Sequence, residues 1–157
     1  MQERKLLLIS RDDMIQTGDD KRANHLFRLL ARFTRGGFHL LATAPQPDSW
    51  SASHGGPDDA LLGPDSMRKR LADSGGVLDG VYYVPRSLLT QKRNRVQALQ
   101  DMLARYGVSP DQCYLFSSQK NFALVARELG IHSVHLNNKN KLINELKALL
   151  LIALPDS

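Results

Sequence analysis

The chain has 157 residues, enough for one domain with a sizeable core. Hydrophobic residues make up 42%, and no apolar run approaches the roughly 20 residues of a membrane span, so we expect a soluble globular protein without a membrane partner. The net charge of +5 suits an anionic partner, but aromatic residues are only 6% and do not interleave with the basic clusters, which argues against a nucleic acid.

The single cysteine, Cys113, excludes an internal disulfide and a cysteine-based zinc site. The first residues lack the pattern of a signal peptide, because only four apolar residues follow Lys5. A cytoplasmic location is therefore the expectation.

The hydrophobic pattern predicts five short strands that alternate with helices. The strands are predicted at 6–9, 38–43, 80–85, 113–116 and 132–136. The helices are predicted at 22–35, 67–74, 94–107, 118–129 and 140–154. Residues 44–66 are rich in Pro, Gly, Ser and Asp and are predicted to form a long loop or lid. This alternation predicts one α/β domain over 1–157, a doubly wound three-layer sandwich around a parallel five-stranded sheet, without a large cap domain.

Ligands of such folds bind outside the carboxyl ends of the strands. Four segments near these ends carry a recognisable order of residues. They are Ser-Arg-Asp-Asp-Met-Ile-Gln at 10–16, Thr-Ala-Pro at 43–45, Tyr-Tyr-Val-Pro at 82–85 before a basic segment with Lys92, and Gly-Val-Ser-Pro at 107–110 before Phe-Ser-Ser-Gln-Lys-Asn at 116–121. Their order resembles the haloacid dehalogenase superfamily of phosphohydrolases, and most closely its branch of histidinol-phosphate and heptose-bisphosphate phosphatases.

The chain departs from this family's pattern at three carboxylates. The resemblance implies an aspartate that is both nucleophile and Mg²⁺ ligand at the end of the first strand, and that position is Ser10. It also implies acidic Mg²⁺ ligands at the positions of Ser117 and Asn121. Hydroxyls and amides replace carboxylates poorly around Mg²⁺. The sequence therefore predicts that the metal site is lost, with Asp12 and Asp13 as the acids nearby.

Other positions keep the residue type that the resemblance implies. Asp12 stands at the family's general acid/base position, and Arg11, Thr43 and Lys92 stand where phosphate contacts are implied. Each has a plainer alternative. Asp12 also suits a turn or helix cap, Thr43 a structural strand end, and Lys92 a solvated basic cluster.

Three interpretations follow. The first is a phosphatase-like protein without phosphatase activity or cofactor, which binds a phosphorylated small molecule or a protein partner. The alternative is a Mg²⁺-dependent phosphoric monoester hydrolase that acts on a small sugar phosphate through Ser10 or Asp12. The third is a structural module that makes no use of the pocket. The apolar end of the chain, residues 149–154, fits either packing on the sheet or a homodimer contact.

Overall fold

A computed structural model describes residues 4–15, 20–45, 64–84, 92–139 and 141–154 of the chain. Its strands are β1 (Lys5–Ser10), β2 (Phe38–Pro45), β3 (Gly80–Val84), β4 (Cys113–Ser117) and β5 (His132–His135). Its α-helices are α1 (Arg11–Ile15), α2 (Asp20–Arg35), α4 (Pro64–Asp73), α6 (Lys92–Tyr106), α7 (Lys120–Glu128) and α8 (Leu142–Ala153). A 3₁₀ turn, η1 (Pro110–Gln112), precedes β4.

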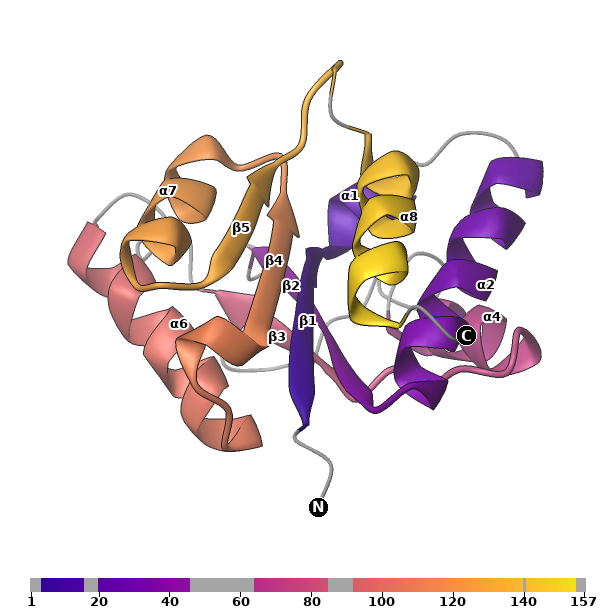
Figure 1. The fold of residues 1–157 in the computed structure, drawn as a ribbon, viewed down its shortest axis with the longest axis horizontal. Helices are drawn as coiled ribbons and strands as arrows, with labels where there is room; N and C mark the ends of the chain where they lie inside the picture. Colours follow the sequence, from indigo (N-terminus) through magenta and orange to yellow (C-terminus); the bar gives the residue numbers. More distant parts are fainter. Residues whose placement is uncertain (1–3, 16–19, 46–63, 85–91, 140, 155–157) are drawn as a thin grey trace, which may run out of the picture.

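The five strands form one sheet in the order β3-β2-β1-β4-β5, and every neighbouring pair is parallel (Figure 1). The central strand β1 has the side chains of Leu6 to Ile9 completely buried. A strand buried on both faces needs an unbroken apolar run rather than an alternating one, which is why this segment reads Leu-Leu-Leu-Ile. The parallel five-stranded sheet predicted from the sequence is confirmed.

Helices cover both faces of the sheet. Leu7 and Ile9 of β1 belong to a hydrophobic cluster with α2, α4 and α8. Leu6 and Leu8 point to the opposite face and belong to a second cluster with α6 and α7. Figure 1 shows α6 and α7 on one side of the strands and α2, α4 and α8 on the other. The three-layer, doubly wound arrangement is therefore also confirmed.

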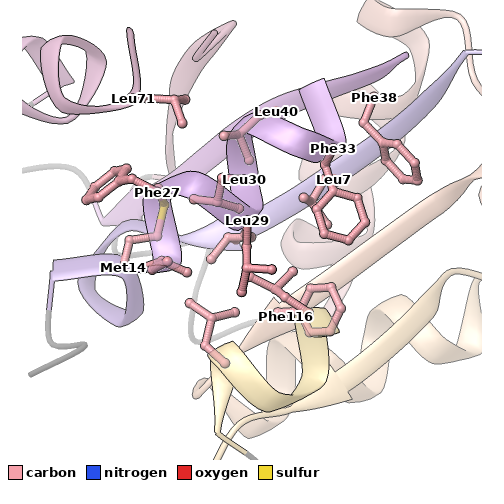
Figure 2. Packing of buried hydrophobic residues seen from close by; sticks show 14 of the residues in the cluster. Leu7, Met14, Phe27, Leu29, Leu30, Phe33, Phe38, Leu40, Leu71 and Phe116 are labelled. Atoms are coloured by element: carbon pink, nitrogen blue, oxygen red, sulfur yellow. The ribbon is translucent and has the colours of Figure 1, made fainter. Parts of the chain in front are cut away.

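The first of these clusters holds α2 against β1 and β2, and Figure 2 shows its leucine and phenylalanine side chains at close range. Phe33 of α2 meets Phe38 of β2 edge to face, with ring centroids 5.1 Å apart. Burial of each such side chain contributes about 1.5–3 kcal/mol. This packing fixes the strands whose carboxyl ends carry the polar residues singled out from the sequence.

The prediction of a long loop over residues 44–66 is wrong at both ends of that range. Ala44 and Pro45 belong to β2, because β3 runs alongside and pairs them with Tyr83 and Val84. Pro64 opens helix α4, where the missing amide proton costs nothing because first-turn amides have no intrahelical acceptor. The remainder of the predicted loop, residues 46–63, lies outside the described residues.

The helices near the sheet edge differ in part from the sequence prediction. A five-residue helix, α1, begins directly after Ser10, where no helix was predicted. The helix predicted from Ser118 begins at Lys120 instead. The reason is local: the Ser117 hydroxyl accepts a hydrogen bond from the Gln119 amide at 3.0 Å, which holds these residues in a turn.

The last helix, α8, packs one face on the first hydrophobic cluster. Its buried residues are Leu142, Leu146, Leu149 and Leu150. Leu151 and Ile152, by contrast, are 76% and 79% exposed. A homodimer contact at this end of α8 stays a prediction. None of the helices in the described ranges combines the length and the apolar character needed to cross a membrane.

Candidate functional site

Three of the predicted site residues meet at the carboxyl edge of the sheet. Ser10 ends β1 and is in register with Thr43 of β2. Because β1 is also the neighbour of β4, the last residue of β4, Ser117, lies on the other side of Ser10. The hydroxyl oxygens of Ser10 and Ser117 are 2.7 Å apart and share a hydrogen bond. Ser117 is only 1% exposed and Thr43 6%, so this bond lies in a water-poor environment.

A short hydrogen-bond network extends from this serine pair into the following turn. Ser117 Oγ accepts a bond from the Gln119 amide at 3.0 Å. The Asp13 carboxylate accepts a bond from the Ser118 amide at 2.9 Å, which ties α1 to the end of β4. The Ser117 carbonyl accepts a bond from the Leu136 amide at 2.8 Å. The polar atoms at the ends of β1 and β4 therefore satisfy one another.

The described side chains at this edge do not fit Mg²⁺, which prefers charged oxygen ligands. A cation between the two strand ends would meet two hydroxyls that already bond to each other. Asp13 is engaged with a backbone amide, and Asp12 is 56% exposed and lies 3.7 Å from the Arg11 guanidinium. Within the described ranges, no group of three or more His, Cys, Asp or Glu side chains is arranged to hold a metal ion.

The other predicted site residues are less closely drawn together. Asn121 is exposed in the first turn of α7. The Arg11 side chain is mostly buried, 16% exposed, beside Asp12. Lys92 is the first residue of α6, and its side chain lies outside the described residues. The role of each of these residues stays a prediction.

Cys113 offers no alternative nucleophile. It lies at the opposite end of β4 from Ser117 and is fully buried. Burial raises the pKa of its thiol from 9.0 to about 12. Because the thiolate is the reactive form, this side chain is inert at neutral pH.

A cavity of about 790 Å³ adjoins the serine pair, and the sequence interpretation missed it. Its described lining residues come from α1, α2, the turn after β4, the turn after β5, and α8. They are Asp13, Lys21, Arg22, His25, Ser118, Leu136, Asn137, Asn138, Lys141, Leu142, Ile143, Asn144 and Lys147. The basic residues at 21–22 were visible in the sequence as one of several clusters. Nothing in the sequence alone paired them with residues of α8 about 120 positions later.

The comparisons with known proteins show a similarity of fold and nothing further. No protein-family model matches this chain, and no curated protein sequence matches it either. An uncharacterized protein from Corynebacterium glutamicum has a similar crystal structure, with a TM-score of 0.63 at 15% identity over 96% of this chain and 95% of that one. A HAD family enzyme from Bacteroides thetaiotaomicron, crystallised with magnesium and inorganic phosphate, gives a TM-score of 0.47 at 10% identity, over 86% of this chain and 95% of that one. The first likeness agrees with the α/β architecture described above.

Proposed function

We propose that this chain is a haloacid dehalogenase-like protein that has lost phosphohydrolase chemistry and acts by binding a phosphorylated small molecule. The observation that carries this proposal is the 2.7 Å hydrogen bond between Ser10 and Ser117. The resemblance places a nucleophilic, metal-binding carboxylate and a second metal ligand at these two strand ends. Two hydroxyls that bond to each other supply no negative charge to a cation, and hydroxyls replace carboxylates poorly around Mg²⁺.

The Ser10 hydroxyl is also a poor nucleophile. A serine hydroxyl needs an adjacent base to attack phosphorus at neutral pH. The described contacts give the Ser10 hydroxyl another hydroxyl as its neighbour, and they place Asp12 beside Arg11. Loss of a nucleophile typically costs on the order of 10⁴–10⁶ in turnover. Loss of the metal would impair the same step, because in this chemistry the metal neutralises charge on the transferred phosphoryl group.

Binding of phosphate does not need the missing carboxylates. In this proposal Arg11, Thr43 and Lys92 hold the phosphate group through their cationic and hydroxyl donors. Thr43 is in register with Ser10 on the neighbouring strand, so its place at the edge supports such a role. The ligand then stays bound and is not hydrolysed.

The test is phosphate release from a broad panel of phosphomonoesters by the full chain at high protein concentration, with Mg²⁺, with Mn²⁺ and with EDTA. Asp12→Asn serves as the control for contaminating phosphatases. We expect no release above that of the Asp12→Asn variant. Metal-dependent release that the variant loses would overturn the proposal and identify a phosphoric monoester hydrolase.

The binding half of the proposal is tested on the same panel by thermal unfolding in EDTA. A ligand at 100 times its Kd stabilises the folded state by about 2.7 kcal/mol. We expect at least one phosphomonoester to raise the unfolding temperature, and Thr43→Val to reduce that rise. A folded protein that responds to no phosphomonoester would overturn this half.

A further inference from the structure

We propose that the cavity between the N-terminal turns of α2 and α8 binds a small organic molecule that carries two or more phosphate groups. This inference concerns residues outside the serine pair and does not depend on the proposed function. It stands on three features of the cavity: the sign of its charge, the two helix ends that meet there, and its mixed polar and apolar wall.

The described lining is strongly cationic. Lys21 and Arg22 come from α2, and Lys141 and Lys147 come from the beginning and middle of the α8 segment. Asp13 is the one carboxylate among the described lining residues, and it already accepts a bond from the Ser118 amide. Four cations that face one carboxylate across a concave surface attract a multiply charged anion. One phosphate monoester carries at most two charges, so a ligand with two or more phosphates matches this set better.

Two helix N-termini open onto the cavity. The strands are parallel, so the helices that follow them return antiparallel, and α2 and α8 both begin at the carboxyl edge of the sheet (Figure 1). A helix N-terminus carries amides that have no acceptor within the helix, together with the positive end of the helix dipole. Lys21 and Arg22 lie in the first turn of α2 and line the cavity.

The N-cap side chain at the start of α8 does not accept a bond from the helix amides. Its N-cap residue is Lys141, which makes no side-chain capping bond. A lysine side chain has donors and no acceptor, so it cannot cap a helix as Ser, Asp or Asn does. A phosphate oxygen is the kind of acceptor that this helix end is missing.

A histidine in the wall has an unmet hydrogen-bonding need. His25 lines the cavity, and its Nε2 atom is buried without a hydrogen-bond partner among the described residues. A buried polar atom left in this state is destabilising. Rotation of the imidazole toward a bound phosphate oxygen would satisfy it.

The rest of the wall suits an organic body. Leu136, Leu142 and Ile143 supply apolar surface, and Asn138 and Asn144 supply amide donors and acceptors. Small-molecule sites combine apolar surface with a few polar groups in volumes of about 300–1,000 Å³. The cavity, at about 790 Å³, lies in that range.

The test is isothermal titration of the full chain with ATP, ADP, AMP, adenosine and inorganic pyrophosphate, all without metal. We expect affinity to rise with the number of phosphates, adenosine not to bind, and pyrophosphate to bind more weakly than ADP. Binding should also weaken as salt is raised. No binding by any polyphosphate at millimolar concentration, by protein shown to be folded, would overturn the inference.

Variants that reverse the charge of a single lysine test whether the ligand binds in this cavity. Lys21→Glu and Lys147→Glu should each weaken ATP binding about tenfold at low salt. Lys69→Glu is the matched control, because Lys69 is an exposed lysine of α4 that does not line the cavity. Equal losses in all three variants would overturn the site. Circular dichroism and thermal unfolding of each variant separate loss of binding from loss of fold.

Two further outcomes separate this inference from its rivals. Loss of ATP binding in Thr43→Val, with Lys147→Glu unchanged, would place the ligand at the strand ends and overturn the cavity, while the proposed function would stand. Far tighter binding of a single-stranded oligonucleotide than of ATP, abolished by Lys147→Glu, would overturn a small-molecule ligand in favour of nucleic acid.

Discussion

The serine pair at the strand ends and the cavity between α2 and α8 share an edge of the sheet but differ in charge. At the strand ends, Ser10 and Ser117 bond to each other and carry no charge. In the cavity, four cations face one carboxylate among the described lining residues. A neutral, self-satisfied pair has nothing to offer a metal ion, whereas a cationic wall can hold phosphate groups without one. In the proposed function, loss of metal chemistry at this edge would therefore not require loss of ligand binding.

The two regions are nevertheless joined. Asp13 lines the cavity, and its carboxylate accepts a bond from the amide of Ser118, the residue directly after the serine pair. A change at one region can therefore reach the other through this one bond.

The largest effect is expected from restoring carboxylates, in the triple variant Ser10→Asp, Ser117→Asp and Asn121→Asp. Two carboxylates would replace hydroxyls that are 2.7 Å apart, one of them almost fully buried. Without metal, their repulsion and desolvation should lower the free energy of unfolding by about 3 kcal/mol or more. Mg²⁺ should recover much of this loss. Thermal unfolding in EDTA and in Mg²⁺ measures both effects.

The matched control for this variant is the double change Ser10→Asn and Ser117→Asn. Asparagine has nearly the size of aspartate but no charge, so its unfolding temperature should not respond to Mg²⁺. The same response in the control and the triple variant, or none in the triple variant, would contradict the alignment of these positions with the metal ligands of the family.

A smaller effect is expected from Ser117→Ala. This change removes the partner of the Ser10 hydroxyl and the acceptor of the Gln119 amide. A buried polar group left unpaired costs about 1–3 kcal/mol, and we expect a loss of stability in that range. Urea unfolding measures it. Ser118→Ala, next along the chain but with an exposed side chain, should stay within about 0.5 kcal/mol of the wild type. Equal losses of stability in both variants would contradict a specific stabilising role for the hydrogen bond between Ser10 and Ser117.

Most of the fold could be predicted from the sequence, because its hydrophobic pattern is regular. The run Leu6–Ile9 and the helical spacing of Leu26, Leu29 and Phe33 predict a buried strand and a covering helix, and both are present. The ends of elements were harder to predict. Ala44 and Pro45 read as loop residues, and they join β2 because β3 lies alongside and pairs with them. That pairing is a tertiary contact that no local pattern encodes.

The candidate site also has one part that could be predicted from the sequence and one part that could not. Strand ends are predictable, so the place of Ser10 and Ser117 at the carboxyl edge followed from the parallel sheet, whereas the pairing of β1 with β4 is a finding of the structure. The cavity was not predictable, because its cations come from residues 21–22 and 141–147 and only the packing of α2 against α8 brings them together. In the sequence, Lys21 and Arg22 are one of several basic clusters. Whether these two residues face only solvent or line a cavity depends on which helix end packs opposite them.

The smallest effect is expected from Asp13→Asn, which tests the residue that joins the two regions. The asparagine carbonyl oxygen can still accept the bond from the Ser118 amide, so stability should change by less than about 1 kcal/mol. Removal of the negative charge should strengthen ATP binding in the cavity about threefold at low salt, because the anion no longer meets a like charge. Titration calorimetry at two salt concentrations measures this gain, and higher salt should shrink it. Asp73→Asn, on the last turn of α4 and outside the cavity lining, should leave ATP affinity unchanged. An unchanged affinity in Asp13→Asn would mean that bound phosphates lie far from this carboxylate, which would restrict the ligand to the α8 side of the cavity.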